Sequence, residues 1–210
     1  MAERDHPHGE GASTALAEPA WDIARIFPGQ GFWSEQEYLD LPTNHLVEFS
    51  DGQIEVLPMP SPAHQRIVRY LFRLFSAFVD TRALGEVLFA PLPVRLRAGQ
   101  FREPDLVFLA AAHRDKDRAK YWAGADLVVE VVSNDNRAHD LETKREEYAR
   151  AGIPEYWIVD PLNGEITVLT LAGDTYREHG RFGAGSEATS VLLPGLAVPV
   201  AGVFAAAEGE

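Results

Sequence analysis

Two carboxylates interrupt segments of the 210-residue sequence that otherwise have the pattern of buried β-strands. Glu130 lies inside the apolar run from Leu127 to Val132, and Asp105 stands at the head of the run 106–110. An ionised carboxylate in a buried strand is costly unless it has a cation, a hydrogen-bond partner or a raised pKa. Carboxylate oxygens from neighbouring strands suit Mg²⁺, with water completing the coordination. Considered alone, Asp105 is better explained as an acidic residue of a turn. The apolar neighbours of Glu130 instead favour a role in a functional site.

A lysine follows the second acid on the next predicted helix. Lys144 comes 14 residues after Glu130, on a helix expected over Asp140–Ala151. With Asp140 and Tyr148 it forms an i, i+4, i+8 stripe, so these three side chains share one face of the helix. This spacing alone favours an ordinary surface ion pair between Asp140 and Lys144.

A long helix is predicted from about Ala63 to Val79, because Ser61-Pro62 supplies an N-cap and a first-turn proline. His64 lies in its first turn, where a lone histidine is usually a surface residue. Basic side chains gather on the solvent-facing stripe of this helix and on the polar face of a later strand: Arg66, Arg69, Arg73, Arg95 and Arg97.

The remaining elements follow from patterning and turn residues. A capping box that begins at Ser34 starts a short helix through Leu39, and Asp51-Gly52 is a hairpin signal. A helical turn is expected over 200–206, and one or two strands precede it. The other predicted strands are Leu46–Ser50, Gln53–Leu57, Glu86–Ala90, Leu92–Arg97, Pro104–Ala110, Asp126–Val132, Glu155–Val159 and Glu165–Leu171. This order of helices and strands predicts a mixed α/β or α+β fold.

Composition limits the classes of protein that fit. The chain has 32 acidic and 19 basic side chains, a net charge of −13 and no cysteine. Disulfides, Cys-ligated zinc, iron–sulfur clusters and thiol nucleophiles are therefore excluded. Residues 61–120 carry 11 basic and six acidic side chains, so most of the acidic side chains lie toward the two ends of the sequence. The global charge excludes a basic coat protein of nucleic acid, but it leaves room for a local phosphate-binding stripe.

Residues 1–20 lack the apolar core of a signal peptide and are poor in large apolar side chains. We therefore expect a disordered tail over 1–20 and a single domain over 21–210. No run approaches the roughly 18 apolar residues of a membrane-spanning helix. The sequence predicts a cytoplasmic protein without a membrane partner.

Six short sequence motifs occur in the order and spacing of a known family. They are Val47-Glu48-Phe49-Ser50-Asp51-Gly52-Gln53-Ile54, Met59–His64, Arg102–Val107, Ala125–Ser133, Asp140–Lys144 with Tyr148, and Gly152–Asp160. On these residues the chain resembles the Uma2 family, also called DUF820, of the PD-(D/E)XK restriction-endonuclease-like superfamily. The resemblance covers roughly residues 34–205. It implies a restriction-endonuclease-like core, in which a central mixed β-sheet is flanked by helices and carboxylates gather at one end.

The resemblance also implies roles for the acids and the lysine. Asp105 corresponds to the acid of the PD element and Glu130 to the acid of the E-x-K element, and together they would bind Mg²⁺ or Mn²⁺. Val132 occupies the usual lysine position, so the resemblance assigns the lysine's role to Lys144 on the following helix. Glu48 corresponds to an acid before the hairpin turn, a further ligand or a polariser of water.

The same resemblance matches His64 to a family histidine near the start of the first long helix. The implied activity is Mg²⁺-dependent cleavage of phosphodiester bonds in DNA. Phosphate contacts of this kind position nucleic acid without reading its sequence. The residues expected to make them are Arg66, Arg69, Arg73, Arg95, Arg97 and Arg102.

Two other functions remain open at this point. The acidity of the chain and the displaced lysine fit a non-catalytic protein that keeps the nuclease fold for binding or for oligomerisation. The net charge of −13 also fits a metal-dependent hydrolase of a small phosphoester. A homodimer is compatible with either function.

Overall fold

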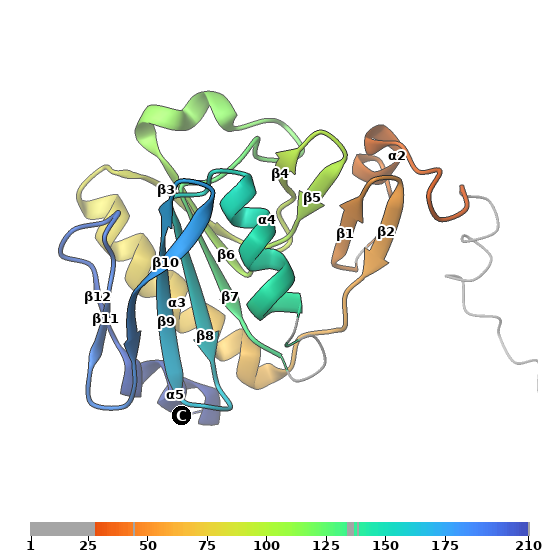
Figure 1. Ribbon diagram of the computed structural model, residues 1–210. Helices are drawn as coiled ribbons and strands as arrows, with labels where there is room; N and C mark the ends of the chain where they lie inside the picture. The colour runs from red at the N-terminus through yellow and green to blue at the C-terminus, as the bar shows by residue number, and fades with distance from the viewer. Residues whose placement is uncertain (1–27, 44, 134–136, 138, 210) are drawn as a thin grey trace, which may run out of the picture.

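A six-stranded mixed β-sheet forms the centre of the molecule (Figure 1). The computed structural model describes residues 28–43, 45–133, 137 and 139–209, so the tail predicted over 1–20 lies outside the described residues. The strands are β3 (Gly85–Phe89), β6 (Leu106–Ala110), β7 (Leu127–Val131), β8 (Glu155–Asp160), β9 (Glu165–Ala172) and β10 (Thr175–Phe182). Their order is β10-β9-β8-β7-β6-β3. Strands β7 and β8 are parallel, and the other neighbours are antiparallel.

A four-stranded sheet lies beside the central one (Figure 1). It consists of β1 (Val47–Ser50), β2 (Gln53–Val56), β4 (Val94–Arg97) and β5 (Gln100–Arg102), in the order β2-β1-β5-β4. The first two strands turn at Asp51-Gly52, where φ is 47° and 83°. Two-residue hairpin turns favour this positive φ, which confirms the predicted hairpin.

Helix α2 (Glu35–Leu39) packs on this smaller sheet. Its capping box at Ser34 is present as predicted, because the Ser34 hydroxyl accepts the Glu37 N–H while the Glu37 carboxylate accepts the Ser34 N–H. Tyr38 stacks on Phe49, with ring centroids 5.3 Å apart, and its hydroxyl donates to the Val47 carbonyl at 2.9 Å. These contacts fix β1 against α2.

Helices cover both faces of the central sheet (Figure 1). Helix α3 (Pro62–Thr81) lies on one face with α5 (Val200–Glu208) packed against it, and α4 (Lys144–Arg150) lies on the other face. The Ser61 side chain accepts the His64 N–H, as the predicted cap requires. A 3₁₀ helix, η1 (Ala111–Lys116), follows β6. A π-helical turn, η2 (His139–Thr143), leads into α4, so the helix predicted over Asp140–Ala151 has α geometry only from Lys144.

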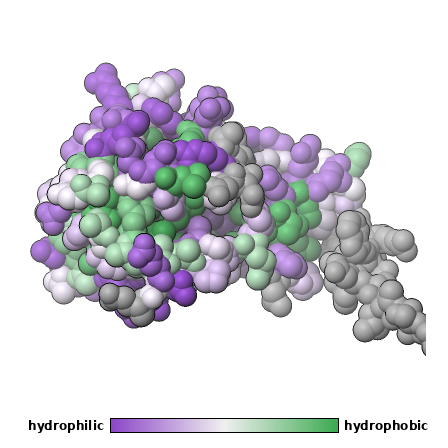
Figure 2. All heavy atoms as spheres, turned by 90° about the horizontal axis from the view of Figure 1, so that it is seen from below, coloured by the Kyte–Doolittle hydropathy of each residue, from purple (hydrophilic) through white to green (hydrophobic). Residues whose placement is uncertain are grey.

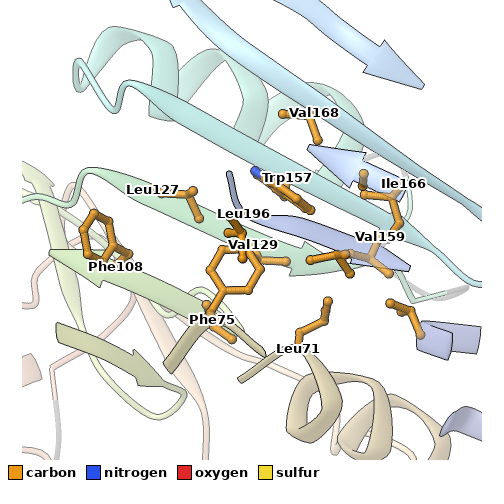
Figure 3. Close-up of a cluster of buried hydrophobic side chains, with 14 of the residues drawn as sticks. Leu71, Phe75, Phe108, Leu127, Val129, Trp157, Val159, Ile166, Val168 and Leu196 are labelled. Carbon is orange, nitrogen blue, oxygen red and sulfur yellow. The ribbon is translucent and has the colours of Figure 1, made fainter. Parts of the chain in front are cut away.

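The main core lies between α3 and the central sheet (Figure 3). Leu71 and Phe75 of α3 are fully buried against Val129, Trp157 and Val159 of the two parallel strands. The Phe75 and Trp157 rings meet edge to face at 5.3 Å. Each such aromatic side chain buries a large apolar area, so this contact anchors α3 on the sheet.

Two short strands were not predicted from the sequence. β5 and β12 (Ala197–Pro199) have three residues each, and β12 pairs with β11 (Glu187–Thr189) outside the main sheets. The mixed sheet flanked by helices confirms the predicted fold class. Within the described part of the chain, none of the helices has the length and apolar character to cross a membrane.

Candidate active site

Asp105 and Glu130 come from neighbouring strands of the central sheet. β6 and β7 pair antiparallel with Leu106 opposite Val129, so one further step in the register sets Asp105 opposite Glu130. Side chains of directly opposed residues lie on the same face of a sheet. The strand pairing therefore brings the two predicted acids to one end of the sheet.

Asp105 is held by one backbone group and one side chain. The Val131 N–H donates to Asp105 Oδ2 at 2.7 Å, and His64 Nε2 lies 3.2 Å from the same oxygen. Both side chains are only 15% exposed. His64 is therefore not the ordinary surface residue that its position in the sequence suggests, because the first turn of α3 directs its ring to the acid.

Glu130 is paired with the lysine on the facing helix. Lys144, the first residue of α4, has its Nζ 3.0 Å from Glu130 Oε1, and the Tyr148 hydroxyl donates to the same oxygen at 2.5 Å. Burial raises the pKa of Tyr148 well above its usual value, and the charge of Glu130 adds to this rise. Tyr148 therefore stays protonated and keeps its hydrogen bond to Glu130. The surface position favoured by helical spacing is wrong for Lys144, which is 4% exposed, and the side chain of its predicted partner Asp140 lies outside the described part of the structure.

A second group of buried charges supports this pair from β1 and β5. Glu48 Oε1 lies 3.3 Å from Lys144 Nζ, and Glu48 Oε2 lies 3.4 Å from Arg102 Nη1. Arg102 also donates two hydrogen bonds to Glu147 of α4, at 2.7 and 2.8 Å. Burial alone would lower the pKa of Arg102, but the bonds to Glu147 and the charge of Glu48 raise it overall. The structure therefore joins the smaller sheet to α4 through alternating charges.

A cavity of about 390 Å³ opens beside these groups. Asp105, Glu130, Lys144 and His64 all line it. Most of the rest of its wall comes from the segment between β2 and α3, the first turns of α3, the end of β7, the turn after β8 and the end of α5. The cavity thus brings together four of the five residues expected to be catalytic. The fifth, Glu48, does not line the cavity but pairs with Lys144.

The donor set of the cavity fits Mg²⁺. Among residues 28–43, 45–133, 137 and 139–209, no three or more His, Asp or Glu side chains form a ready metal cluster. Mg²⁺ does not require one, since it is commonly bound through one or two carboxylates and keeps several waters. Asp105 and Glu130 supply two carboxylates, and the open volume of the cavity leaves room for water.

The six arginines expected to bind phosphate do not form one surface. Arg69 and Arg73 are exposed on α3, whereas Arg66 donates to the Ala207 carbonyl at 3.1 Å. Arg95 and Arg97 of β4 pair with Glu35 of α2 and with Asp51 of the β1–β2 turn, respectively. Arg102 is 5% exposed and belongs to the buried charge network described above.

Glu103 is a cavity residue that sequence reasoning did not single out. Its carboxylate accepts the Val47 N–H at 3.0 Å, and its own N–H donates to Glu48 at 3.4 Å. It lines the same cavity as Asp105, two residues away in sequence. Its position in the family motif Arg102–Val107, directly before the PD element, was the sequence feature that could have indicated it. The pKa of Glu103 is raised to about 7. Burial is the largest cause and the charge of Glu48 adds to the rise, while the hydrogen bond from Val47 opposes it.

The raised pKa makes Glu103 a source of pH-dependent stability. Between about pH 4.5 and pH 7 the folded chain binds a proton on Glu103 that the unfolded chain has lost. The free energy of unfolding should therefore fall as the pH rises through this window, by up to about 3 kcal/mol from this residue. Glu103→Gln should remove this contribution to the pH dependence of the free energy of unfolding, measured by urea unfolding between about pH 4.5 and pH 7. Glu146→Gln, an exposed control, should keep it, and an unchanged slope in Glu103→Gln would refute the assignment.

Comparison with solved structures supports this fold. A crystal structure described as "a putative nuclease belonging to DUF820 from Anabaena variabilis" aligns with a TM-score of 0.69 and 17% sequence identity. The alignment covers 83% of this chain and 99% of the other. This likeness confirms the fold expected from the sequence, a central mixed sheet flanked by helices. No curated protein matches the sequence significantly.

A family comparison covers most of the region that builds the cavity. The family model Uma2, described as "Putative restriction endonuclease", matches residues 35–201. That range contains both sheets, α3, α4 and every residue expected to be catalytic. The chain therefore belongs to the Uma2 family.

Proposed function

We propose that the protein is a Mg²⁺-dependent endonuclease that hydrolyses phosphodiester bonds in DNA, with Mn²⁺ as an alternative ion. One observation carries the proposal: Lys144 Nζ lies 3.0 Å from Glu130 in the cavity that Asp105 also lines. Two carboxylates can hold a divalent ion at a phosphodiester, and a lysine beside them can stabilise the negative charge that develops in its hydrolysis. The nuclease descriptions of the family and of the structural relative support the same reaction class.

The protein's part in this reaction is to hold the ion and arrange charge around it. Asp105 and Glu130 would bind Mg²⁺, which supplies charge neutralisation at the phosphate and a more acidic water. His64 and the Val131 N–H keep the Asp105 carboxylate in place. Tyr148 does the same for Glu130.

Lys144 is the cation available to the phosphate or to the attacking water. Its contacts with Glu130 and Glu48, 3.0 and 3.3 Å away, hold the ammonium group at the cavity wall. A positive charge fixed in advance stabilises the negative charge that develops in the transition state without further rearrangement. Lys144 thus performs, from α4, the part that the E-x-K pattern gives to the strand position occupied here by Val132.

The proposal is tested by cleavage of labelled oligonucleotides with the purified chain in Mg²⁺, Mn²⁺ or EDTA. We expect cleavage that requires the ion and is lost in Glu130→Gln. The matched control is Glu146→Gln, since Glu146 is an exposed acid of α4 that pairs with Arg150. Equal cleavage by wild type and Glu130→Gln would indicate a contaminating nuclease. Calorimetry that finds no Mg²⁺ or Mn²⁺ binding would instead favour a non-catalytic protein.

A further inference from the structure

The cavity has a large apolar lining that phosphodiester hydrolysis itself does not use. Beside the charged residues, its wall is formed mostly by aliphatic side chains and prolines. They come from just before β1, the segment between β2 and α3, α3, the end of β7 and the turn after β8. Among them are Leu46, Leu57, Met59, Ile67, Val132 and Leu162. A wall of this kind binds an apolar part of a ligand, with the few polar groups fixing its orientation.

Two of these side chains stand exposed at the cavity. Met59 is 82% exposed and Leu162 is 63% exposed, and both are among the lining residues. The turn between β8 and β9 lies at the lower end of Figure 1, and Figure 2, which views the molecule from below, shows hydrophobic residues next to strongly hydrophilic ones. Large apolar side chains that stay exposed in the wall of a cavity with polar groups are typical of a binding site.

The backbone holds both exposed side chains on stiff segments. Met59 lies between Pro58 and Pro60, whose rings fix φ on either side. Leu162 follows Pro161 in a turn that Asp160 braces, because the Asp160 carboxylate accepts the Leu162 N–H at 3.1 Å. A ligand that packs against such side chains pays little to order the backbone beneath them.

The charges that line the cavity do not suit a long duplex. Among its described lining residues, Lys144 and His64 are the basic side chains, against Glu103, Asp105 and Glu130. None of the six arginines expected to bind phosphate lines it. Duplex DNA gains its affinity from many lysine and arginine contacts along the phosphate backbones. This cavity offers a place for one phosphate beside an apolar wall.

We propose that the substrate is single-stranded nucleic acid, bound through one unpaired nucleotide whose base packs against Met59 and Leu162. The inference rests on the proposed nuclease function, since the adjoining phosphate must reach Asp105 and Glu130. A base already unpaired enters such a pocket without the cost of unstacking, and hydrophobic packing against it tolerates any sequence. A base inside a duplex would first have to leave its stack.

The test measures cleavage and binding with the same variants. Cleavage is followed on a labelled single strand, on the same strand annealed to its complement, and on a duplex with an unpaired flap. Binding is followed by fluorescence anisotropy of a labelled oligothymidylate in Ca²⁺. The test variant is Met59→Ala/Leu162→Ala. The control is Val191→Ala, because Val191 is 51% exposed and does not line the cavity.

We expect the single strand and the flap to be cut faster than the duplex. The double variant should lose about tenfold in kcat/KM on the single strand, and about tenfold in oligothymidylate affinity, while Val191→Ala stays at the wild-type level. Duplex cleavage as fast as single-strand cleavage, or unchanged binding in the double variant, would overturn the inference and leave the nuclease proposal standing. Absence of cleavage, with binding still weakened in the double variant, would support the binding site and overturn the nuclease proposal.

Discussion

Replacing Lys144 by methionine should lower the free energy of unfolding by about 3–5 kcal/mol, because the change removes the cation that lies between two buried carboxylates. Lys144 is 4% exposed and lies between Glu48 and Glu130, which are 0% and 3% exposed. Methionine fills a similar volume, so the loss comes from charge rather than from a void. Urea unfolding of the two proteins at neutral pH measures the difference.

Two further variants separate this electrostatic effect from a general sensitivity to substitution. Lys120→Met removes a cation that pairs with Asp40 while both side chains are half exposed, so stability should change little. Adding Glu48→Gln to Lys144→Met should recover part of the loss, since the buried network then loses one negative charge together with the positive one. If Lys144→Met is as stable as Lys120→Met, the buried ion pairs are not what holds α4 against β1.

Asp105→Asn should reduce cleavage by about 100-fold to 1,000-fold, the scale on which loss of one fixed electrostatic contact acts. Asparagine keeps an oxygen that can accept the Val131 N–H, which now donates to Asp105 at 2.7 Å. It removes the negative charge needed to bind Mg²⁺. The free energy of unfolding should therefore change by no more than about 1 kcal/mol. Initial rates on a labelled oligonucleotide, together with urea unfolding, test both parts.

The chain offers a closely matched control for Asp105. Asp126 also precedes a strand of the central sheet, accepts a backbone N–H from Ala110 at 2.7 Å, and lies 2.7 Å from a histidine, His113. It does not line the cavity. Asp126→Asn should keep wild-type cleavage, and an equal loss in both variants would mean that the effect is structural.

Local patterning was sufficient for most of the elements. The capping box at Ser34, the Asp51-Gly52 turn and the Ser61-Pro62 helix start each depend on neighbours within a few residues, and all three are present. β5 was missed because three residues between Gly99 and Glu103 are too few to show alternation. It forms through long-range pairing with β1 and β4.

The charged centre of the molecule could not be read from spacing. Glu48, Arg102 and Glu147 lie about 45 to 55 residues apart in the sequence and meet only after both sheets and α4 are assembled. Arg102 was expected to contact phosphate, although it is buried in this network. Lys144 was assigned only through the family resemblance, since helical spacing favoured the surface. Asp105 and Glu130 could be predicted from the sequence, because each is an acidic residue in or beside an otherwise apolar strand.

The most direct test of the proposed metal site is the anomalous scattering of Mn²⁺ in crystals of the wild-type protein. We predict one strong peak in the cavity, in contact with carboxylate oxygens of Asp105 and Glu130, with Lys144 beside it. Crystals of Asp105→Asn grown in the same solution should lack that peak. No peak between these two carboxylates in the wild type, at a Mn²⁺ concentration that supports cleavage, would contradict the proposed site.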